Sequence, residues 1–464
     1  MKRLKISGKD LRKVGIEDDR AASITKNILQ NHYKQLRKKD ALEIVKKVIN
    51  NPDKFRNHPE LGEVAEALKT PQKSATKSVN LSETKPYSIY GKNHIEPGAL
   101  NQMETAMKLP VSLKGSLMPD AHQGYGLPIG GVLATKNEVI PYGVGMDIGC
   151  RMCMSIYPID KNYIQSNNSK LKKILNEHTR FGSSEFKEEK EYAIMERVEL
   201  REIRLLRTLK KKAYDQLGTS GHGNHFVDIG IVDIKENIKE KNLSPGKYFA
   251  ILSHSGSRGT GAEIARYYTK VASQFCELPK GAKSLAWLDL STQEGEEYWK
   301  AMNWAGDYSA ANHHIIHDKL SKALGEKPNA IIENHHNFAW KETQSNGEQW
   351  IIHRKGATPA SKGALGVIPG SMASPAYIVE GLGNEESLNS AAHGAGRLMS
   401  RSAAKKQFTP NQLQEHLAEK GITLIGAGTD EAPMAYKNIN TVMAEQDDLV
   451  KKIAIFEPKI VKMG

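Results

Sequence analysis

The N-terminal part of the chain places hydrophobic residues at helical spacing. Within residues 21–36 they recur at steps of three and four, after Asp18 or Asp19 as an N-cap. Residues 40–49 repeat this spacing between Asp40, a second candidate cap, and a proline at position 52. Pro59 begins a similar pattern that runs to position 68. The pattern predicts three short helices.

The amino-acid composition changes along the chain and divides it into two parts. Residues 72–86 are polar and read as a linker, which predicts an N-terminal helical extension (1–85) and a larger domain (86–464). In the larger domain, glycines separate short apolar runs, a pattern typical of strands and tight turns. A charged segment at about 160–217 predicts an inserted helical hairpin. We therefore expect a mixed α/β (α+β) fold.

Composition narrows the classes of protein. The mean hydropathy is −0.53, and no apolar run approaches the ~20 residues of a membrane span. Residues 1–15 are basic and polar, unlike a signal peptide. Three cysteines are too few for a secreted disulfide scaffold. These features predict no membrane association and a cytoplasmic location.

The chain is strongly basic, with 66 Lys and Arg residues against 53 Asp and Glu residues and a net charge of +13. Such a balance favours polyanionic partners, namely RNA, DNA or a phosphorylated ligand. The sequence leaves open whether the basic N-terminal helices bind RNA or only pack onto the larger domain as a structural extension.

Potential metal ligands lie in separate glycine-rich loops. One carboxylate, one thiolate and several imidazoles suit zinc, manganese, iron or cobalt. The candidates are Asp147, Cys150, His225, His254, His336 and His393.

Two other spacings resemble metal motifs. Cys150 and Cys153 form a CxxC, but no second CxxC follows, and alternation along a strand would turn the two thiols to opposite faces. His313 and His317 are four residues apart, but the glutamate of HExxH is missing. We interpret Cys153, His313 and His317 as structural.

Three loops carry the chemistry of phosphate binding. Residues 255–261 (SGSRGTG) offer backbone N–H groups, hydroxyls and a guanidinium, whereas 353–358 (HRKGAT) and 369–374 (PGSMAS) offer positive charge and hydroxyls. No Walker A sequence occurs. Beside a metal cluster, such loops indicate metal-assisted phosphoryl or nucleotidyl transfer.

Nine ordered strings carry a family resemblance across residues 89–464: MPDAHQGYGLPIGGV, GVGMDIGC, GNHF, HSGSRG, HHNFA, HRKGAT, PGSM, HGAGR and DEAPMAYKNI. In these strings the chain resembles the RtcB family of RNA ligases. The resemblance implies an RtcB-like α/β fold and an enzyme that uses GTP and Mn²⁺. Such enzymes join an RNA 3′-phosphate or 2′,3′-cyclic phosphate to a 5′-hydroxyl through a histidine–GMP intermediate.

The resemblance also implies a role for each site residue. His393 would be the nucleophile, and Cys150 would bridge two manganese ions. One ion would also take Asp147 and His225, and the other His254 and His336. Asp120 matches an acidic position beside the active site. The positions implied for binding nucleotide or RNA phosphate are Asn224, Asp228, Arg258, Lys355, Ser371, Gly394, Ala395, Gly396, Tyr436 and Lys462.

Four positions depart from the family's usual pattern: Arg151 follows the bridging cysteine, Asp228 replaces glutamate, Pro359 replaces arginine, and Ala373 replaces glycine. The implied ligand set is intact, so we expect catalysis to be retained, in the repair of RNA such as tRNA or rRNA fragments. A metal-dependent phosphoesterase that trims RNA ends without ligation, and a non-catalytic RNA-binding paralogue, remain alternatives. The sequence leaves the need for an activating protein open.

Overall fold

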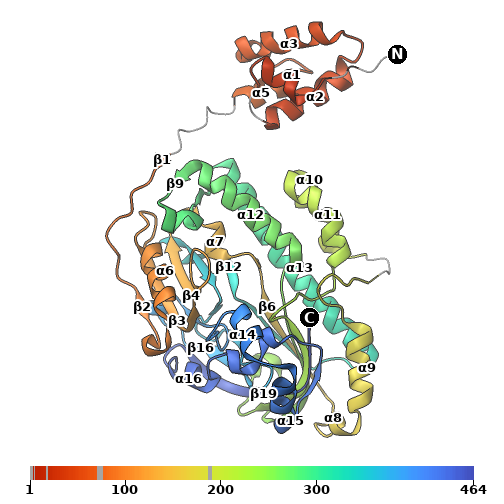
Figure 1. Cartoon of the computed structure of the whole chain (residues 1–464), viewed down its shortest axis with the longest axis vertical. Coiled ribbons are helices and arrows are strands. Elements are labelled where there is room, and N and C mark those ends of the chain that lie inside the picture. The colour runs from red at the N-terminus through yellow and green to blue at the C-terminus, as the bar shows by residue number, and fades with distance from the viewer. Residues whose placement is uncertain (1–3, 5, 17–18, 70–76, 187–190) are drawn as a thin grey trace. The chain divides into compact units, whose positions relative to one another are not determined.

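The computed structural model describes residues 4, 6–16, 19–69, 77–186 and 191–464, and the chain divides into two compact units, Met1–Lys77 and Ser78–Gly464 (Figure 1). The sequence placed the division near residue 85. From Val79 onward the polar segment lies on the larger unit. The Val79 amide donates to the Glu277 carbonyl at 2.9 Å, and the Ser82 amide donates to the Lys108 carbonyl at 2.8 Å. Residues 72–76 of the predicted linker lie outside the described residues.

The N-terminal unit is helical, and all three predicted helices are confirmed. Its helices are α1 (Gly8–Lys13), α2 (Asp19–His32), α3 (Lys38–Asn50), α4 (Pro52–Phe55) and α5 (Gly62–Lys69). Asp40 lies in the first turn of α3, whose N-cap is Arg37. Apolar side chains from α1, α2 and α3, including the fully buried Leu11 and Leu29, form a core of its own.

An eight-stranded sheet forms the centre of the larger unit. The strand order is β11-β6-β8-β7-β19-β16-β15, and β18 pairs in parallel with β19. The edge strands β11 and β15 contact each other, so the sheet nearly closes into a barrel. The strands are β6 (Arg151–Tyr157), β7 (Phe226–Ile234), β8 (Gly246–Ser255), β11 (Ala330–His335), β15 (Leu365–Pro369), β16 (Ala376–Gly381), β18 (Thr423–Ile425) and β19 (Val450–Met463).

A second, five-stranded sheet has the order β12-β13-β4-β3-β2. Its strands are β2 (Ser88–Ile89), β3 (Lys114–His122), β4 (Ile129–Thr135), β12 (Asn337–Thr343) and β13 (Gln349–Lys355). Shorter strands are β1 (Lys77–Ser78), β5 (Glu138–Val139), β9 (Cys276–Glu277), β10 (Leu288–Asp289), β14 (Ala357–Pro359) and β17 (Ser390–Ala392). The mixed α/β prediction is confirmed.

Two long helices, α12 (Arg258–Phe275) and α13 (Gln293–Leu324), pack against each other in the larger unit (Figure 1). The predicted insertion is helical, with α9 against α13 and α11 against α12, so its two longer helices lie on the body of the unit. The remaining helices are α6 (Pro97–Met107), α7 (Pro141–Val144), α8 (Tyr163–Ser166), α9 (Asn168–His178), α10 (Glu199–Glu202), α11 (Arg204–Gln216), α14 (Arg401–Gln407), α15 (Pro410–Glu419) and α16 (Ile439–Ala444). None of the described helices has the length and apolar character that a bilayer crossing requires.

Alternation along β6 separates two environments. Met152, Met154 and Ile156 join the apolar core enclosed by the large sheet. The side chains between them, Cys153 and Ser155, face the other way, toward histidines of α13. This period-two pattern lets one strand serve both the core and the helix layer.

The division into two units predicts separable effects on stability. Leu11 is 0% exposed, and the Leu11→Ala change should lower the stability of the N-terminal unit by about 2–5 kcal/mol. Calorimetric unfolding should show a shifted transition for that unit and an unchanged one for the larger unit. The matched change in the larger unit, Leu117→Ala, should do the reverse; a single transition that both changes shift equally would contradict the division.

Candidate functional site

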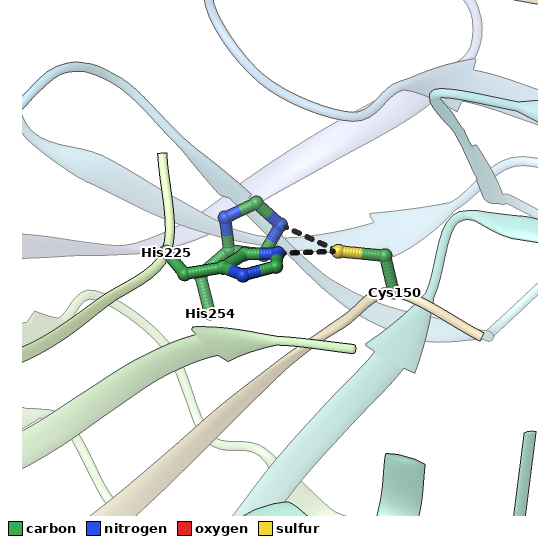
Figure 2. Close-up of side chains that lie close together, drawn as sticks. All are labelled: Cys150, His225 and His254. Carbon is green, nitrogen blue, oxygen red and sulfur yellow. Dashed lines mark hydrogen bonds between the residues drawn. The ribbon is translucent and has the colours of Figure 1, made fainter. Parts of the chain in front are cut away.

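Three buried side chains meet at one end of the large sheet. The Cys150 Sγ lies 3.1 Å from the His254 Nε2 and 3.4 Å from the His225 Nε2 (Figure 2). The His225 Nε2 also lies 2.9 Å from an Asp147 carboxylate oxygen, and the His254 Nε2 lies 3.2 Å from the His336 Nε2. The structure thus brings together all five residues that the resemblance implied as metal ligands.

Strand order explains this convergence. β11, β6, β8 and β7 are consecutive neighbours, and each pair is antiparallel. Cys150 precedes β6, His225 precedes β7, His254 lies at the end of β8, and His336 follows β11. In antiparallel neighbours, the start of one strand lies beside the end of the next, at the same end of the sheet. Residues far apart in sequence therefore become adjacent there.

The cluster has the electrostatics of a metal site. Burial lowers the pKa of His254 to about 3 and holds the pKa of His336 well below its usual value, so both imidazoles are neutral at pH 7. The His254 Nδ1 lies 2.9 Å from the Asn224 carbonyl; with Nδ1–H donating to it, Nε2 is left free for a metal. The Nδ1 atoms of His225 and His336 are buried without a partner. This Cys–His–Asp set fits a divalent transition metal.

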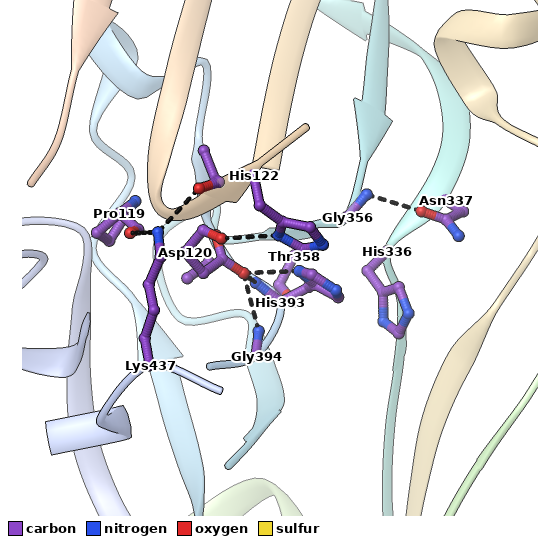
Figure 3. Close-up of polar contacts among 12 residues, drawn as sticks. Pro119, Asp120, His122, His336, Asn337, Gly356, Thr358, His393, Gly394 and Lys437 are labelled. Carbon is purple, nitrogen blue, oxygen red and sulfur yellow. Dashed lines mark hydrogen bonds and ion pairs between the residues drawn. The ribbon is translucent and has the colours of Figure 1, made fainter. Parts of the chain in front are cut away.

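A buried carboxylate positions His393 beside this cluster. The Asp120 Oδ2 lies 2.6 Å from the His393 Nδ1, and it accepts the backbone N–H groups of His393 and Gly394 at 3.0 and 3.1 Å (Figure 3). Asp120 is fully buried. With Nδ1–H donating to the carboxylate, Nε2 keeps its lone pair. The ring centroids of His393 and His336 are 5.0 Å apart, so the nucleophile candidate adjoins the metal candidates.

Asp120 lies at an irregularity of β3. The pairing of β3 with β4 changes register between Leu117 and His122, which frees backbone carbonyls in between. Lys437 satisfies two of them, because its Nζ donates to the Pro119 and Ala121 carbonyls at 3.2 and 2.8 Å. Gly396 has φ of +73°, and a Cβ there would collide with the Asp120 carbonyl, so the HGAGR loop needs glycine at this position.

A cavity of about 680 Å³ opens beside His393. Its size is in the range of small-molecule sites. Asp228 is of interest in it, because its buried Oδ1 has no partner and burial raises the pKa of its carboxyl well above the usual range. Eight sequence-predicted residues line the cavity besides His254: Asn224, Asp228, Ser371, His393, Gly394, Ala395, Gly396 and Tyr436.

Three predicted phosphate or nucleotide positions do not line this cavity. Arg258 donates to the Thr219 hydroxyl at 3.1 Å and the Gly182 carbonyl at 2.5 Å. Lys355 donates to the Tyr125 carbonyl and, at 2.8 Å, to the Leu127 carbonyl, and burial lowers its pKa to about 7. Lys462 donates to the Leu175 carbonyl at 3.0 Å. In this structure all three side chains donate hydrogen bonds to groups of the protein itself.

Sequence reasoning assigned no role to a charged network in the cavity wall. Glu431 accepts hydrogen bonds from the Tyr436 hydroxyl and, at 2.8 Å each, from Arg397 and Arg401. Glu431 is 3% exposed. Glu431 and Arg397 belong to the strings DEAPMAYKNI and HGAGR, so both residues stood in recognised motifs. Their spacing in the sequence gave no sign that they contact each other, because the contact is made only in the fold.

A second buried group, Cys153, His313 and His317, also has metal-ligand types within 4.8 Å of one another. Here every imidazole nitrogen already has a partner. The Ser255 carbonyl can only accept a hydrogen bond, so the His313 Nε2–H at 3.1 Å must be the donor. The direction of the other hydrogen bonds follows: Ser155 donates to His317, His317 to Ser253, and Ser253 to His313, each at 2.6–2.7 Å. The structural interpretation of these residues is supported, because these hydrogen bonds tie α13 to β6 and β8.

The departure at Arg151 lies away from the Cys150 cluster. Its guanidinium is 3.5 Å from the Glu333 carboxylate on the neighbouring strand β11, and the side chain is 10% exposed. Pro359 pairs with Ser390 in the short β14–β17 ladder. Neither side chain is among those that contact the candidate metal ligands or line the cavity.

Removing one ligand should weaken metal binding. Cys150→Ser and His254→Ala should each lower Mn²⁺ affinity by at least about tenfold, since even the loss of a residue that only orients a ligand costs this much. Isothermal titration calorimetry measures the change directly. Cys153→Ser is the matched control, because its thiol is equally buried in the second group. Equal losses for Cys150→Ser and Cys153→Ser would contradict the assignment.

The second group should affect stability alone. Ser253→Ala leaves one nitrogen of His313 and one of His317 unpaired, which should lower the free energy of unfolding by about 1–3 kcal/mol in chemical denaturation. Bound Mn²⁺ should be unchanged. Ser309→Ala is the control, because Ser309 is buried with an unpartnered hydroxyl and should lose less. Loss of metal from Ser253→Ala without loss of stability would overturn this interpretation.

Comparison with known proteins gives the family. A family model described as tRNA-splicing ligase RtcB matches residues 102–464. The RNA-splicing ligase RtcB of Escherichia coli (strain K12) is 33% identical over 405 residues, covering 80% of this chain and 96% of the relative. The tRNA-splicing ligase RtcB of Pyrobaculum aerophilum is 32% identical, covering 75% and 87%, and that of Methanococcus maripaludis is 30% identical, covering 80% and 92%. The chain therefore belongs to the RtcB family.

Proposed function

We propose that this protein is an RNA ligase that uses GTP and Mn²⁺ to join a 3′-phosphate or 2′,3′-cyclic phosphate end to a 5′-hydroxyl end. The observation that carries the proposal is the contact between Asp120 and His393 at a cavity that adjoins the Cys–His–Asp cluster. Family membership supports RNA as the substrate, since the relatives are named as RNA-splicing or tRNA-splicing ligases.

His393 acts as the nucleophile in this proposal. The Asp120 carboxylate holds the Nδ1 proton, so Nε2 presents its lone pair. Nε2 forms a bond to the α-phosphorus of GTP while the bond between that phosphorus and the bridging oxygen breaks, and pyrophosphate leaves. The resulting imidazolium charge is stabilised by the carboxylate at 2.6 Å. Imidazole is a good leaving group for the next transfer.

The proposed metals are two manganese ions. Cys150 would bridge them, with Asp147 and His225 on one and His254 and His336 on the other. Bound there, they would neutralise phosphate charge and stabilise the leaving oxygen. The Nε2 atoms of His225 and His254 lie 3.4 and 3.1 Å from the Cys150 Sγ, and the His336 Nε2 lies 3.2 Å from the His254 Nε2, which supports this use of the donor set.

The cavity is the proposed site of the guanosine. Asp228 offers a buried carboxyl oxygen, Oδ1, that has no partner and suits the N–H groups of a guanine edge or the hydroxyls of a ribose. Tyr436 lines the cavity with its hydroxyl on Glu431, and the Arg397 guanidinium lies 4.9 Å from its ring centroid, which holds the ring in place.

The guanylate then passes to RNA. An oxygen of the RNA 3′-phosphate attacks the phosphorus held on His393, and the N–P bond breaks to restore the neutral imidazole. A cyclic end must first be opened by water to the 3′-phosphate. The 5′-hydroxyl of the second end then attacks the activated 3′-phosphate, its proton is lost, and GMP leaves. The energy for joining thus comes from GTP.

Guanylylation of the protein is the direct test. Incubation with α-labelled GTP and Mn²⁺ should give an acid-labile, alkali-stable label on the chain, and His393→Ala should give none. Asp120→Asn should slow labelling by about 10²–10⁴-fold with a smaller change in GTP affinity, because it removes the group that fixes the imidazole tautomer.

A surface histidine provides the control for this test. His314→Ala should label normally, because His314 is exposed and pairs with Glu333 away from the cavity. Absence of label on the metal-loaded protein, with RNA ends nevertheless processed, would refute the ligase and favour a phosphoesterase.

A further inference from the structure

Most of the protein's net positive charge lies in its small N-terminal unit. Residues 1–77 contain 19 Lys and Arg residues against 10 Asp and Glu residues, a net charge of +9 out of +13. The larger unit has 47 against 43 and is almost neutral. A family model that begins at residue 102 leaves this unit without a role.

The fold gathers part of this charge on one edge of the unit. Lys38 at the start of α3 forms an ion pair with Asp10 of α1 at 2.7 Å, which brings the two helices together. This ion pair links α1, which carries Lys9, Arg12 and Lys13, to the start of α3. We call the exposed cations of α1 and of residues 34–39 the basic edge: Lys9, Arg12, Lys13, Lys34, Arg37, Lys38 and Lys39.

The two carboxylates within the basic edge each pair with one of its cations. Asp10 pairs with Lys38, and Asp40 pairs with Arg37 at 2.9 Å. Among the described residues, no carboxylate forms an ion pair with Lys9, Lys13, Lys34 or Lys39. Such clustered ammonium groups suit a ligand that carries closely spaced negative charges.

The rest of the unit's surface indicates which class of polyanion it suits. The large hydrophobic side chains that the structure leaves exposed lie in the larger unit, and the described part of the N-terminal unit has none. Its Tyr33 and Phe55 are partly buried in the helical cores. The described residues of this unit form no exposed apolar face for a protein and no aromatic platform for stacking unpaired bases, so the surface suits the backbone of a base-paired helix.

We propose that the basic edge docks the phosphate backbone of a folded RNA whose broken ends the larger unit joins. The proposal rests on the ligase function proposed above and adds a substrate class: breaks in base-paired RNA. Because both units belong to one chain, an RNA held by the N-terminal unit is kept close to the ligase unit.

Binding of the full chain to two RNAs tests the proposal without GTP or metal. The first probe is a nicked RNA hairpin with 3′-phosphate and 5′-hydroxyl ends, and the second is an unstructured RNA of equal length and charge. The triple change Lys13→Gln, Lys34→Gln and Lys39→Gln should weaken hairpin binding by about tenfold and reduce the slope of log affinity against log salt by about 2–3. Binding of the unstructured RNA should change by less than about threefold.

The matched control removes the same charge from elsewhere in the unit, by Lys46→Gln, Lys47→Gln and Lys54→Gln. It should weaken hairpin binding by less than about threefold. Equal losses in the two triple variants would mean that only net charge matters and would overturn the proposal, as would equal losses for the two RNAs.

Guanylylation separates this proposal from the ligase function. The basic-edge variant should label with GTP at the rate of the unchanged protein, and its KM for the hairpin should rise with kcat unchanged. Hairpin binding that depends on the basic edge, without any guanylylation, would refute the ligase and leave the docking surface standing. Normal guanylylation with hairpin binding and KM unaffected by the basic-edge change would refute the docking surface alone.

Discussion

The arrangement of this site depends on one carboxylate oxygen. The Asp120 Oδ2 receives the His393 imidazole and two consecutive backbone N–H groups, so it fixes both the ring and the loop that carries it. A buried charge needs such compensation, and three donors at 2.6–3.1 Å provide it. The irregular stretch of β3 that presents Asp120 is in turn held by Lys437, and the close approach of Gly396 leaves the loop no room for a side chain. These contacts place the proposed nucleophile in the lining of the cavity.

The metal candidates depend on a different constraint, the order of four antiparallel strands. The order β11-β6-β8-β7 brings four residues to one end of the sheet, although the first and last are 186 positions apart in the sequence: Cys150, His225, His254 and His336. The buried hydrogen-bond chain of serines and histidines ties two of these strands, β6 and β8, to α13. The candidate ligands therefore lie at the ends of paired strands, which favours a site whose geometry exists before a metal binds.

Sequence reasoning succeeded where the signal is local or carried by ordered motifs. Helical spacing identified α2, α3 and α5, and alternation correctly separated Cys150 from Cys153. The motif strings named the residues that the fold brings together around Cys150 and His393. Contacts made only in the fold were not foreseen: Glu431 between Arg397 and Tyr436, and the attachment of residues 79–85 to the larger unit. A motif also does not show where a long side chain points. The Lys462 Nζ donates to the Leu175 carbonyl, and Lys462 is not among the residues that line the cavity.

The tautomer of His393 is the most direct test of this account. Long-range ¹H–¹⁵N correlation spectra of histidine-labelled protein, with His393 assigned by the loss of its signal in His393→Ala, report which ring nitrogen carries the proton. The account predicts a proton on Nδ1, facing Asp120, and an Nε2 that carries none. A proton on Nε2 of the neutral ring would contradict it, because the nitrogen beside the metal ligands would then have no lone pair with which to attack phosphorus.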